Sequence, residues 1–488
     1  MLNILKNEAA LTYTENGAIT NSTSGSCCLD LFFRAGGMRN SEEKEIAELV
    51  IRSYCENPEK TMKIIFFIRD VRGGLGERRF FRAAIRTLAD FAPAAVIRNI
   101  GYFAEYGRFD DLCVLLGTPC EDAAVEIIRT QLDKDIKAAE NGGKVSLLAK
   151  WLPSVNASAA ETREKGKTLA KKLGMKDKVY RTTLSRLRKY TDIIENRLRT
   201  VDYTFDYEKQ CSRAMFKYRK AFLRNDKCRY EEFLSDVENG KAVYNSSTLF
   251  PYDIVRAASV VYNDSEEIRV LDTAWRNLPA FGVNDENALA VIDGSGSMYW
   301  SGTGNVEPVN VALSLGIYFA EHNKGTFKNH FITFSHKPQL VEIKGADIVE
   351  KVNFCRTYNE VADTNLEAVF ELILSAAVKN NVPQSEMPGK LYIISDMEFN
   401  SCIIGGNDDT LFRKMKAGYN QFGYKLPDII FWNVASRHSN IPVTVSDTGA
   451  ALVSGFSPSV FDMVIGGDIN PELIMDNIIG SERYARVG

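Results

Sequence analysis

The feature that most constrains the fold is an apolar run that ends in an aspartate and a Gly/Ser loop, at residues 288–298 (ALAVIDGSGSM). A continuous apolar run of this length is typical of a strand buried on both faces of a parallel sheet. Open α/β sheets bind their ligands at the carboxyl ends of such strands. We therefore expect Asp293, Ser295 and Ser297 at a ligand-binding edge, where oxygen donors suit Mg²⁺ or Mn²⁺.

The periodicity of the chain changes near residue 283. Before that point apolar residues recur at helical spacing, in segments of about 10–18 residues, which predicts a helical solenoid with degenerate repeats. After it, strands are expected at 288–293, 330–334, 340–343, 391–395, 429–433 and 450–453. Helices are expected between or after them at 308–323, 366–379, 410–419 and 471–479. This alternation predicts a mostly parallel sheet with helices on both faces.

The predicted fold is therefore multidomain. An N-terminal arm, polar and rich in Asn, Thr, Ser and Gly, covers residues 1–30. An all-α solenoid covers 31–283 and an α/β domain covers 284–488. The length of 488 residues supplies enough material for large hydrophobic cores.

Composition excludes several classes of protein. No apolar run approaches the ~18 residues that a membrane span needs, and the first residues show no signal-peptide pattern. The nine cysteines are odd in number and contain no Cys-x-x-Cys, which favours reduced thiols and a cytoplasmic protein. The four histidines lack zinc-like spacing.

Downstream residues complete the predicted oxygen-lined site. A second apolar run, at 391–396, also ends in an aspartate, and Thr364 stands at the start of a helix. The expected ligands of Mg²⁺ (or Mn²⁺) are Asp293, Ser295, Ser297, Thr364 and Asp396. The alternative is a Gly/Ser loop beside two ordinary strand ends. Asp363 and Glu398 are close enough to tune such a site, and we expect supporting or surface roles for them because nothing marks either as a general base.

The order Asp-x-Ser-x-Ser, then Thr, then Asp resembles a von Willebrand factor A domain over residues 285–488. The resemblance implies a Rossmann-like fold and a metal-ion-dependent adhesion site. In that family the site holds Mg²⁺ and leaves one position open for an acidic group of a partner. Binding rather than catalysis is therefore expected.

Residues 66–79 (FFIRDVRGGLGERR) join an apolar helix to a glycine-rich turn and a basic helix start. The pattern is no Walker loop, and it predicts an interhelical turn with an ion network among Arg69, Asp70, Glu77 and Arg78. This segment and 101–112 (GYFAEYGRFDDL) resemble TROVE-module (Ro autoantigen) proteins. The segments 150–154 (KWLPS) and 212–222 (SRAMFKYRKAF) are similar to a poorly characterised TROVE-like branch that also ends in a von Willebrand A domain. The resemblance implies a HEAT-like, ring-shaped solenoid that binds small structured RNAs and single-stranded ends of misfolded RNAs.

The charge distribution points to a polyanion independently. Residues 161–230 hold 21 Lys and Arg against 9 Asp and Glu, a net +12, so in a chain of net −3 the remainder carries −15. The candidate RNA-binding residues are Lys144, Lys150, Arg181, Arg186, Arg188, Lys189, Arg213, Lys217, Arg219, Lys220 and Arg224. Tyr180, Tyr190, Phe216 and Tyr218 are interleaved with them as candidates for base stacking. Alternatively, the aromatic residues belong to the core and the cations form a solvated face.

The leading hypothesis is a cytoplasmic, non-enzymatic RNA-binding protein in which the Mg²⁺-dependent domain closes the ring or binds an acidic partner. No membrane association and no DNA specificity are expected. The alternative is a protein-interaction scaffold whose metal site grips an acidic residue of a partner. A metal-dependent nuclease is least favoured, because a two-metal centre needs more carboxylates than the two found here.

Overall fold

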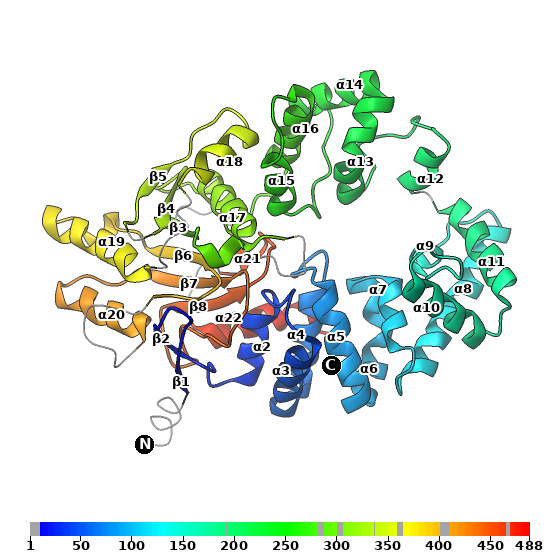
Figure 1. Cartoon of the computed structure of the whole chain (residues 1–488), viewed down its shortest axis with the longest axis horizontal. Helices are drawn as coiled ribbons and strands as arrows, with labels where there is room; N and C mark the ends of the chain where they lie inside the picture. The colour runs from blue at the N-terminus through cyan, green and yellow to red at the C-terminus, as the bar shows by residue number, and fades with distance from the viewer. Residues whose placement is uncertain are drawn as a thin grey trace.

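The computed structural model describes residues 10–191, 193–281, 287–299, 306–335, 337–358, 365–400, 410–464 and 469–488. Within them the chain forms a short N-terminal hairpin, a helical body over residues 22–281, and an α/β unit over residues 287–488. Figure 1 shows the helices of the body following an arc whose two ends meet the α/β unit. The predicted combination of an all-helical region and an α/β domain is confirmed.

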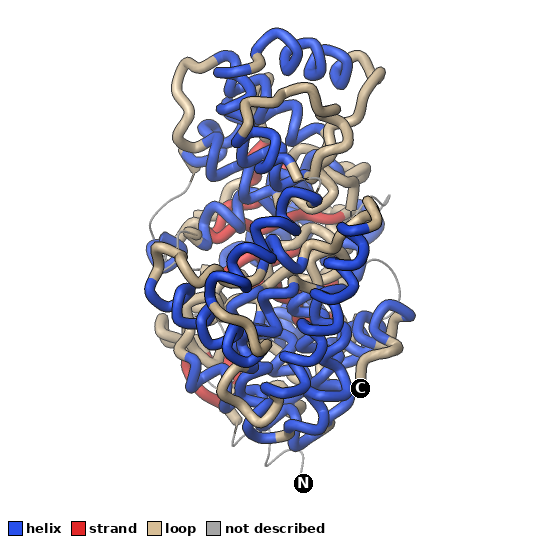
Figure 2. The backbone as a smooth tube through the Cα atoms, turned by 90° about the vertical axis from the view of Figure 1, so that its right-hand side faces the viewer, coloured by secondary structure: helices blue, strands red, loops and turns tan. Residues whose placement is uncertain are grey.

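The hairpin and the helical body come first in the chain. Strands β1 (Leu11–Tyr13) and β2 (Ile19–Asn21) pair antiparallel. The α-helices of the body are α2 (Cys27–Ala35), α3 (Glu43–Glu56), α4 (Pro58–Arg69), α5 (Arg78–Phe91), α6 (Pro93–Asn99), α7 (Phe103–Tyr106), α8 (Glu121–Glu140), α9 (Leu148–Trp151), α10 (Ala160–Lys172), α11 (Asp177–Tyr190), α12 (Ile194–Arg199), α13 (Ser212–Asn225), α14 (Lys227–Glu238), α15 (Pro251–Ala258) and α16 (Ser265–Arg276). Short 3-10 helices lie at Ile100–Tyr102 (η1) and Phe109–Leu115 (η2). Helices dominate the side of the molecule seen in Figure 2.

The α/β unit carries the predicted sheet. Its strands are β3 (Ala288–Asp293), β4 (His330–Phe334), β5 (Leu340–Glu342), β6 (Lys390–Ser395), β7 (Asp428–Asn433) and β8 (Ala450–Ser454). Its α-helices are α17 (Pro308–His322), α18 (Ile348–Arg356), α19 (Leu366–Asn380), α20 (Leu411–Gln421), α21 (Val460–Met463) and α22 (Pro471–Ile479), with 3-10 helices η3 (Gly296–Tyr299), η4 (Gln384–Glu386) and η5 (Glu482–Tyr484). Among the described residues, the six strands lie in the order β5-β4-β3-β6-β7-β8, and only β5 runs antiparallel to its neighbour.

Both faces of the sheet are covered, as the apolar runs predict. Strands β3 and β6 are buried along their whole length. On one face the ring of Tyr392 packs against Phe319 of α17, with centroids 4.6 Å apart. On the other, Phe431 packs against Phe412 of α20 at 6.4 Å. The predicted strands coincide with the observed ones to within a residue or two, whereas α18 was not predicted.

Helix α17 lies between the sheet and the helical body. Residues 308–320 are all buried, because β3 packs on one side of the helix and α15 on another. Gly316 permits the close approach to β3, since a Cβ there would lie 2.2 Å from Cδ1 of Ile292. The indole nitrogen of Trp275, in α16, donates to Glu321 of α17 at 2.6 Å. The last helices of the body are thereby fixed on the α/β unit.

The first helices of the body are fixed on the same unit. The hydroxyl of Ser454, at the end of β8, donates to the carbonyl of Phe32 in α2 at 3.0 Å. The C-terminal tail then reaches the buried carboxylate of Asp70, to which Tyr484 donates at 3.0 Å and Arg483 Nη2 at 2.7 Å. Both ends of the body therefore meet on the α/β unit, which closes the arc seen in Figure 1.

The predicted ion network within residues 66–79 is wrong in its partners. Arg69 pairs at 2.8 Å with Asp111, which follows α7. Glu77 pairs with Arg39 after α2, and Asp70 pairs with the C-terminal tail. Each of these three buried groups therefore finds its counter-charge on another segment of the chain.

The predicted arm also differs from the structure. Helix α2 begins at Cys27, inside the segment predicted as an arm up to residue 30. The hydroxyl of Ser26 caps it, and the carboxylate of Glu56 accepts the backbone N–H groups of Cys27 and Cys28. None of the described helices is both long and apolar enough to cross a lipid bilayer.

Candidate metal and RNA-binding sites

The two predicted aspartates lie next to each other at one edge of the sheet. Strands β3 and β6 are neighbours and run parallel, with Ile292 opposite Ile394. Their carboxyl ends therefore coincide, which places Asp293 beside the residues that end β6. The side chains of Asp293 and Asp396 are both buried, at 0% and 2% exposure. The geometry that the sequence predicts for these carboxylates is thus present.

The serines of the Gly/Ser loop join the aspartates. The backbone N–H of Ser295 donates to Asp293 Oδ1 at 2.9 Å, which turns the loop back over the strand end. The hydroxyl oxygens of Ser295 and Ser297 are 3.1 Å apart, and Ser297 is hydrogen-bonded to Asp396. Four of the five predicted ligands are therefore brought together. Thr364 lies outside the described residues, as does the neighbouring Asp363.

The electrostatics of this cluster favour a cation. Burial, reinforced by the neighbouring Asp396 carboxylate, raises the pKa of Asp293 above its usual range. Burial also raises the pKa of Asp396, although hydrogen bonding from Ser297 and the charge of Arg437 oppose the shift. Two carboxylates held together away from water destabilise each other's charged forms. Two aspartates and two hydroxyls are a donor set that fits Mg²⁺ or Mn²⁺.

Two further residues at this edge were not predicted. The hydroxyl of Ser395, the last residue of β6, donates to Asp293 Oδ2 at 2.6 Å. Its position one residue before Asp396 was an available signal. Arg437, after β7, donates to Asp396 Oδ2 at 3.0 Å. No local pattern connects Arg437 to Asp396, because only the sheet order brings the ends of β6 and β7 together.

A cavity of about 700 Å³ opens next to this edge, between the helical body and the α/β unit. The body contributes Arg39 and Glu42, and the α/β unit contributes Arg437, His438 and Phe456. The guanidinium of Arg39 lies 3.9 Å from the centroid of the Phe456 ring. The candidate metal site therefore adjoins the junction of the two parts rather than an isolated domain surface.

The predicted RNA-binding cations fall into two groups. Arg188 and Arg219 are engaged internally: Arg188 Nε donates to the carbonyl of Ala149 at 2.7 Å, and Arg219 pairs with the buried Glu267 at 2.7 Å. Both therefore stabilise helix packing. Lys150 is partly buried and pairs with Glu195 at 3.2 Å. The remaining candidates are exposed: Lys144, Arg181, Arg186, Lys189, Arg213, Lys217, Lys220 and Arg224.

The exposed cations of α13 form a basic stripe. Arg213, Lys217, Lys220 and Arg224 follow one another at intervals of four, three and four residues, which places them on one face of a helix. Arg213 and Lys220 have carboxylates at 3.4 and 3.8 Å. Within the described part of the chain, Lys217 and Arg224 form no salt bridge. We refer to these four residues as the α13 stripe.

The aromatic candidates divide in the same way. Tyr180 is fully buried and donates to the carbonyl of Pro153 at 2.9 Å, so it belongs to the core. Tyr190 is 46% exposed. Phe216 and Tyr218 are partly buried and lie beneath the cations of Arg219 and Lys217. The core interpretation of the aromatic residues therefore holds for Tyr180.

Comparisons with known proteins give relatives without a described activity. A family model described as Domain of unknown function (DUF2828) matches residues 14–133 and 156–280, and one described as Domain of unknown function (DUF7788) matches residues 287–477. An uncharacterised protein of Acanthamoeba polyphaga mimivirus is 28% identical over 517 residues, covering 96% of this chain and 87% of the viral protein. The crystal structure of the Deinococcus radiodurans RO (RSR) protein is similar with a TM-score of 0.37 and 12% identity, over 96% of each chain.

Proposed function

The chain belongs to the family described as Domain of unknown function (DUF2828), and since that description names no activity, we propose a function from the charges and contacts of the chain itself. The proposed function is non-catalytic binding of RNA, either small structured RNA or single-stranded ends. The observation that carries it is the α13 stripe, within a stretch of net charge +12 in a chain of net charge −3. Lys217 and Arg224 of this stripe, which form no salt bridge among the described residues, are available to phosphates.

The residues to test are chosen because their side chains are exposed and form no salt bridge in the part of the chain that the structure describes. Arg219 is unsuitable for charge reversal, because a carboxylate there would face the buried Glu267 and destabilise the fold. The chosen positions are exposed and, among the described residues, form no salt bridge: Arg181, Lys189, Lys217 and Arg224. A matched control reverses the same number of exposed lysines on the α/β unit: Lys324, Lys328, Lys337 and Lys379. Both variants change the net charge equally.

The assay is filter binding of a hairpin RNA with a single-stranded end, across a salt series. We expect the first variant to bind more weakly at every salt concentration. Its slope of log affinity against log salt should fall in magnitude by roughly 3, at ~0.7 per lost single-strand phosphate contact. The control variant should retain the wild-type slope. Equal losses in both variants would show that only net charge matters and would refute the site.

The cluster of Asp293, Ser295, Ser297 and Asp396 supports a second candidate function, a Mg²⁺-dependent contact with an acidic group of a protein partner. The support is the pair of buried carboxylates with raised pKa values at an edge that adjoins a cavity. Asp293→Asn should abolish Mg²⁺-dependent retention of such a partner while leaving RNA binding intact. Retention that survives both this substitution and chelation of Mg²⁺ would rule out the metal-mediated contact.

A further inference from the structure

The N-terminal hairpin is docked on the loops that follow β6 and β7. The side-chain amide of Asn16 donates to the carbonyl of Glu398 at 2.7 Å. Asn21 and Ile441 exchange backbone hydrogen bonds of 3.0 and 2.9 Å. Figure 1 shows β1 and β2 lying against the α/β unit. A segment nearly 400 residues away in sequence is thereby held at the edge where the sheet strands end.

Three metal-ligating side chains converge where the hairpin meets this edge. His438 Nδ1 lies 2.8 Å from Glu398 Oε1, and the backbone N–H of Glu15 donates to Glu398 Oε2 at 2.8 Å. One ligand atom each from Glu15, Glu398 and His438 lies within 4.8 Å of the others. The side chain of Glu398 is buried at 1% exposure, whereas those of His438 and Glu15 are 54% and 52% exposed. Solvent can therefore reach the cluster from one side.

We propose that Glu15, Glu398 and His438 bind Zn²⁺ or a similar transition-metal dication, which ties the N-terminal hairpin to the α/β unit. One imidazole nitrogen and two carboxylate oxygens are donors that Zn²⁺ takes at ~2.0–2.2 Å. Two such ligands in a tetrahedral shell lie about 3.3 Å apart, so the 2.8 Å between His438 Nδ1 and Glu398 Oε1 needs to widen by only a few tenths of an ångström. A small movement of the exposed Glu15 carboxylate supplies the third ligand, and water completes the shell.

The charged groups around the cluster favour the binding of a divalent cation. One guanidinium nitrogen of Arg437 lies 3.0 Å from Glu15 Oε2 and 3.0 Å from Asp396 Oδ2. The carboxyl groups of Glu15, Asp396 and Glu398 thus gather near this guanidinium. A divalent cation offsets the negative charge of carboxylates held this close together, and the attraction is stronger at the buried Glu398 than it is in water.

This cluster differs in chemistry from the oxygen-lined site formed by Asp293 and its neighbours. Imidazole suits Zn²⁺, whereas Mg²⁺ is bound by carboxylates, carbonyls and water. The proposed site also requires the hairpin, because Glu15 is the ligand that comes from it. Binding should therefore order the hairpin, which gives a readout independent of both RNA binding and the first site.

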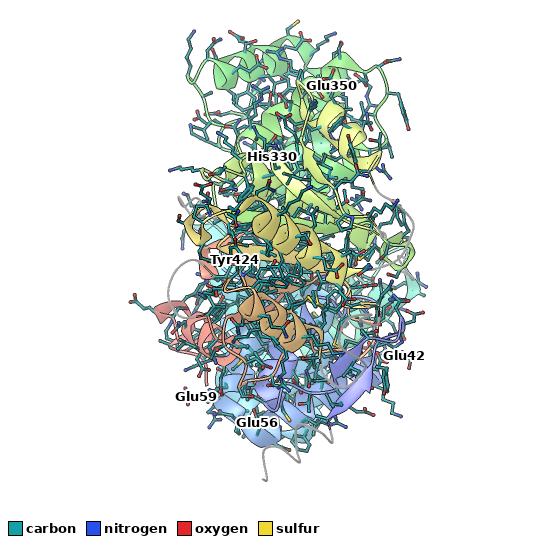
Figure 3. The ribbon with its side chains drawn as sticks, turned by 90° about the vertical axis from the view of Figure 1, so that its left-hand side faces the viewer. Glu42, Glu56, Glu59, His330, Glu350 and Tyr424 are labelled. Atoms are coloured by element: carbon teal, nitrogen blue, oxygen red, sulfur yellow. The ribbon has the colours of Figure 1, made fainter. Side chains whose placement is uncertain are left out.

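The experiment titrates the full chain with Zn²⁺ in excess Mg²⁺ and without RNA. It counts bound Zn²⁺ by equilibrium dialysis and follows amide hydrogen exchange in residues 11–21. The test variant is His438→Ala, at a half-exposed position where folding is not at risk. The control is His330→Ala. His330 lies in the upper part of the α/β unit in Figure 3, away from Glu42, which lines the same cavity as His438.

Wild type and His330→Ala should each bind one Zn²⁺ equivalent more than His438→Ala. Zn²⁺ should slow exchange in residues 11–21 in these two proteins and not in His438→Ala. Glu15→Gln should lose the same exchange effect. Equal Zn²⁺ binding by His438→Ala and wild type would overturn the proposal, as would Zn²⁺ binding that leaves exchange in the hairpin unchanged. An RNA-binding failure would not affect either result, because no RNA is present.

Discussion

Replacing Asp70 with Asn should loosen the junction between the C-terminal tail and the helical body. The carboxylate of Asp70 is fully buried. It accepts from the backbone N–H of Arg72 at 3.0 Å, from Tyr484 at 3.0 Å and from Arg483 Nη2 at 2.7 Å. Asp70→Asn keeps the shape of the side chain, but it leaves the Arg483 guanidinium facing a neutral amide. The tail then loses its ion pair with the residue that follows α4.

The expected loss in the free energy of unfolding follows from the burial of the Asp70 carboxylate. Removing one partner of a fully buried ion pair costs about 3–5 kcal/mol. The side chain of Arg483 is 36% exposed, so water recovers part of that energy and we expect about 2–3 kcal/mol. For a chain of 488 residues that unfolds as one unit, this loss lowers the unfolding temperature by roughly 2–3 °C.

The effect should depend on pH. Burial alone would raise the pKa of Asp70, but the hydrogen bond from Arg483, the backbone N–H of Arg72 and the Arg483 charge together lower it. A lowered pKa in the folded state stabilises the fold above the ordinary Asp value of 3.8, and this contribution is lost as pH falls through the folded value. The gap between wild type and Asp70→Asn should therefore be full at pH 7 and narrow below about pH 4.

Differential scanning calorimetry measures the loss of stability, and faster amide hydrogen exchange in residues 482–488 would show that the loss arises at the C-terminal tail. The matched control is Glu105→Gln, which removes the exposed partner of Arg486 on the same tail and should cost less than ~1 kcal/mol. If Asp70→Asn unfolds no earlier than Glu105→Gln, and exchange in the tail is the same in both, the assignment of the junction to Asp70 is wrong.

Two further predictions concern packing and thiol reactivity. Gly316→Ala should lower the free energy of unfolding by about 1–3 kcal/mol, because its Cβ would lie 2.2 Å from Ile292 Cδ1. Gly418→Ala, in a helix with open space around it, should raise that free energy by about 0.5–1 kcal/mol. Equal denaturant midpoints for the two variants would contradict the packing of α17 on β3. Burial raises the pKa of Cys113 to about 12. Iodoacetamide at pH 8 should therefore modify the exposed Cys55 and spare Cys113 in the native protein. Equal labelling of the two cysteines, measured by mass spectrometry, would contradict the burial of α5 against η2.

The α/β unit was largely predictable because its signals are local. The runs that became β3 and β6 are apolar throughout and end in polar residues, and parallel strands with covered faces require that pattern. Once adjacent parallel strands are assumed, the meeting of Asp293 and Asp396 follows. Helix α18 was missed because it is short and its apolar periodicity is weak.

The candidate RNA-binding residues were predictable only as a group. The excess of positive charge is visible in sequence, but the environment of each cation is not. Arg188 and Arg219 occur in the same basic helices as Arg181 and Lys217. Arg188 and Arg219 lie on helix faces that pack against neighbouring segments. There Arg188 donates to the carbonyl of Ala149, and Arg219 pairs with the carboxylate of Glu267.

The sequence by itself determined the change from helices to an α/β sheet, the strands of that sheet and four members of its oxygen-lined cluster, because hydrophobic period and strand-end polarity are properties of neighbouring residues. Only the tertiary structure decided which distant charges meet. Asp70 pairs with Arg483 and Glu15 approaches His438 across more than 400 residues of chain. The physical reason is that a buried charge requires a counter-charge, and the packing of distant segments decides which residue provides it. Neighbouring residues in the sequence therefore do not identify the partner.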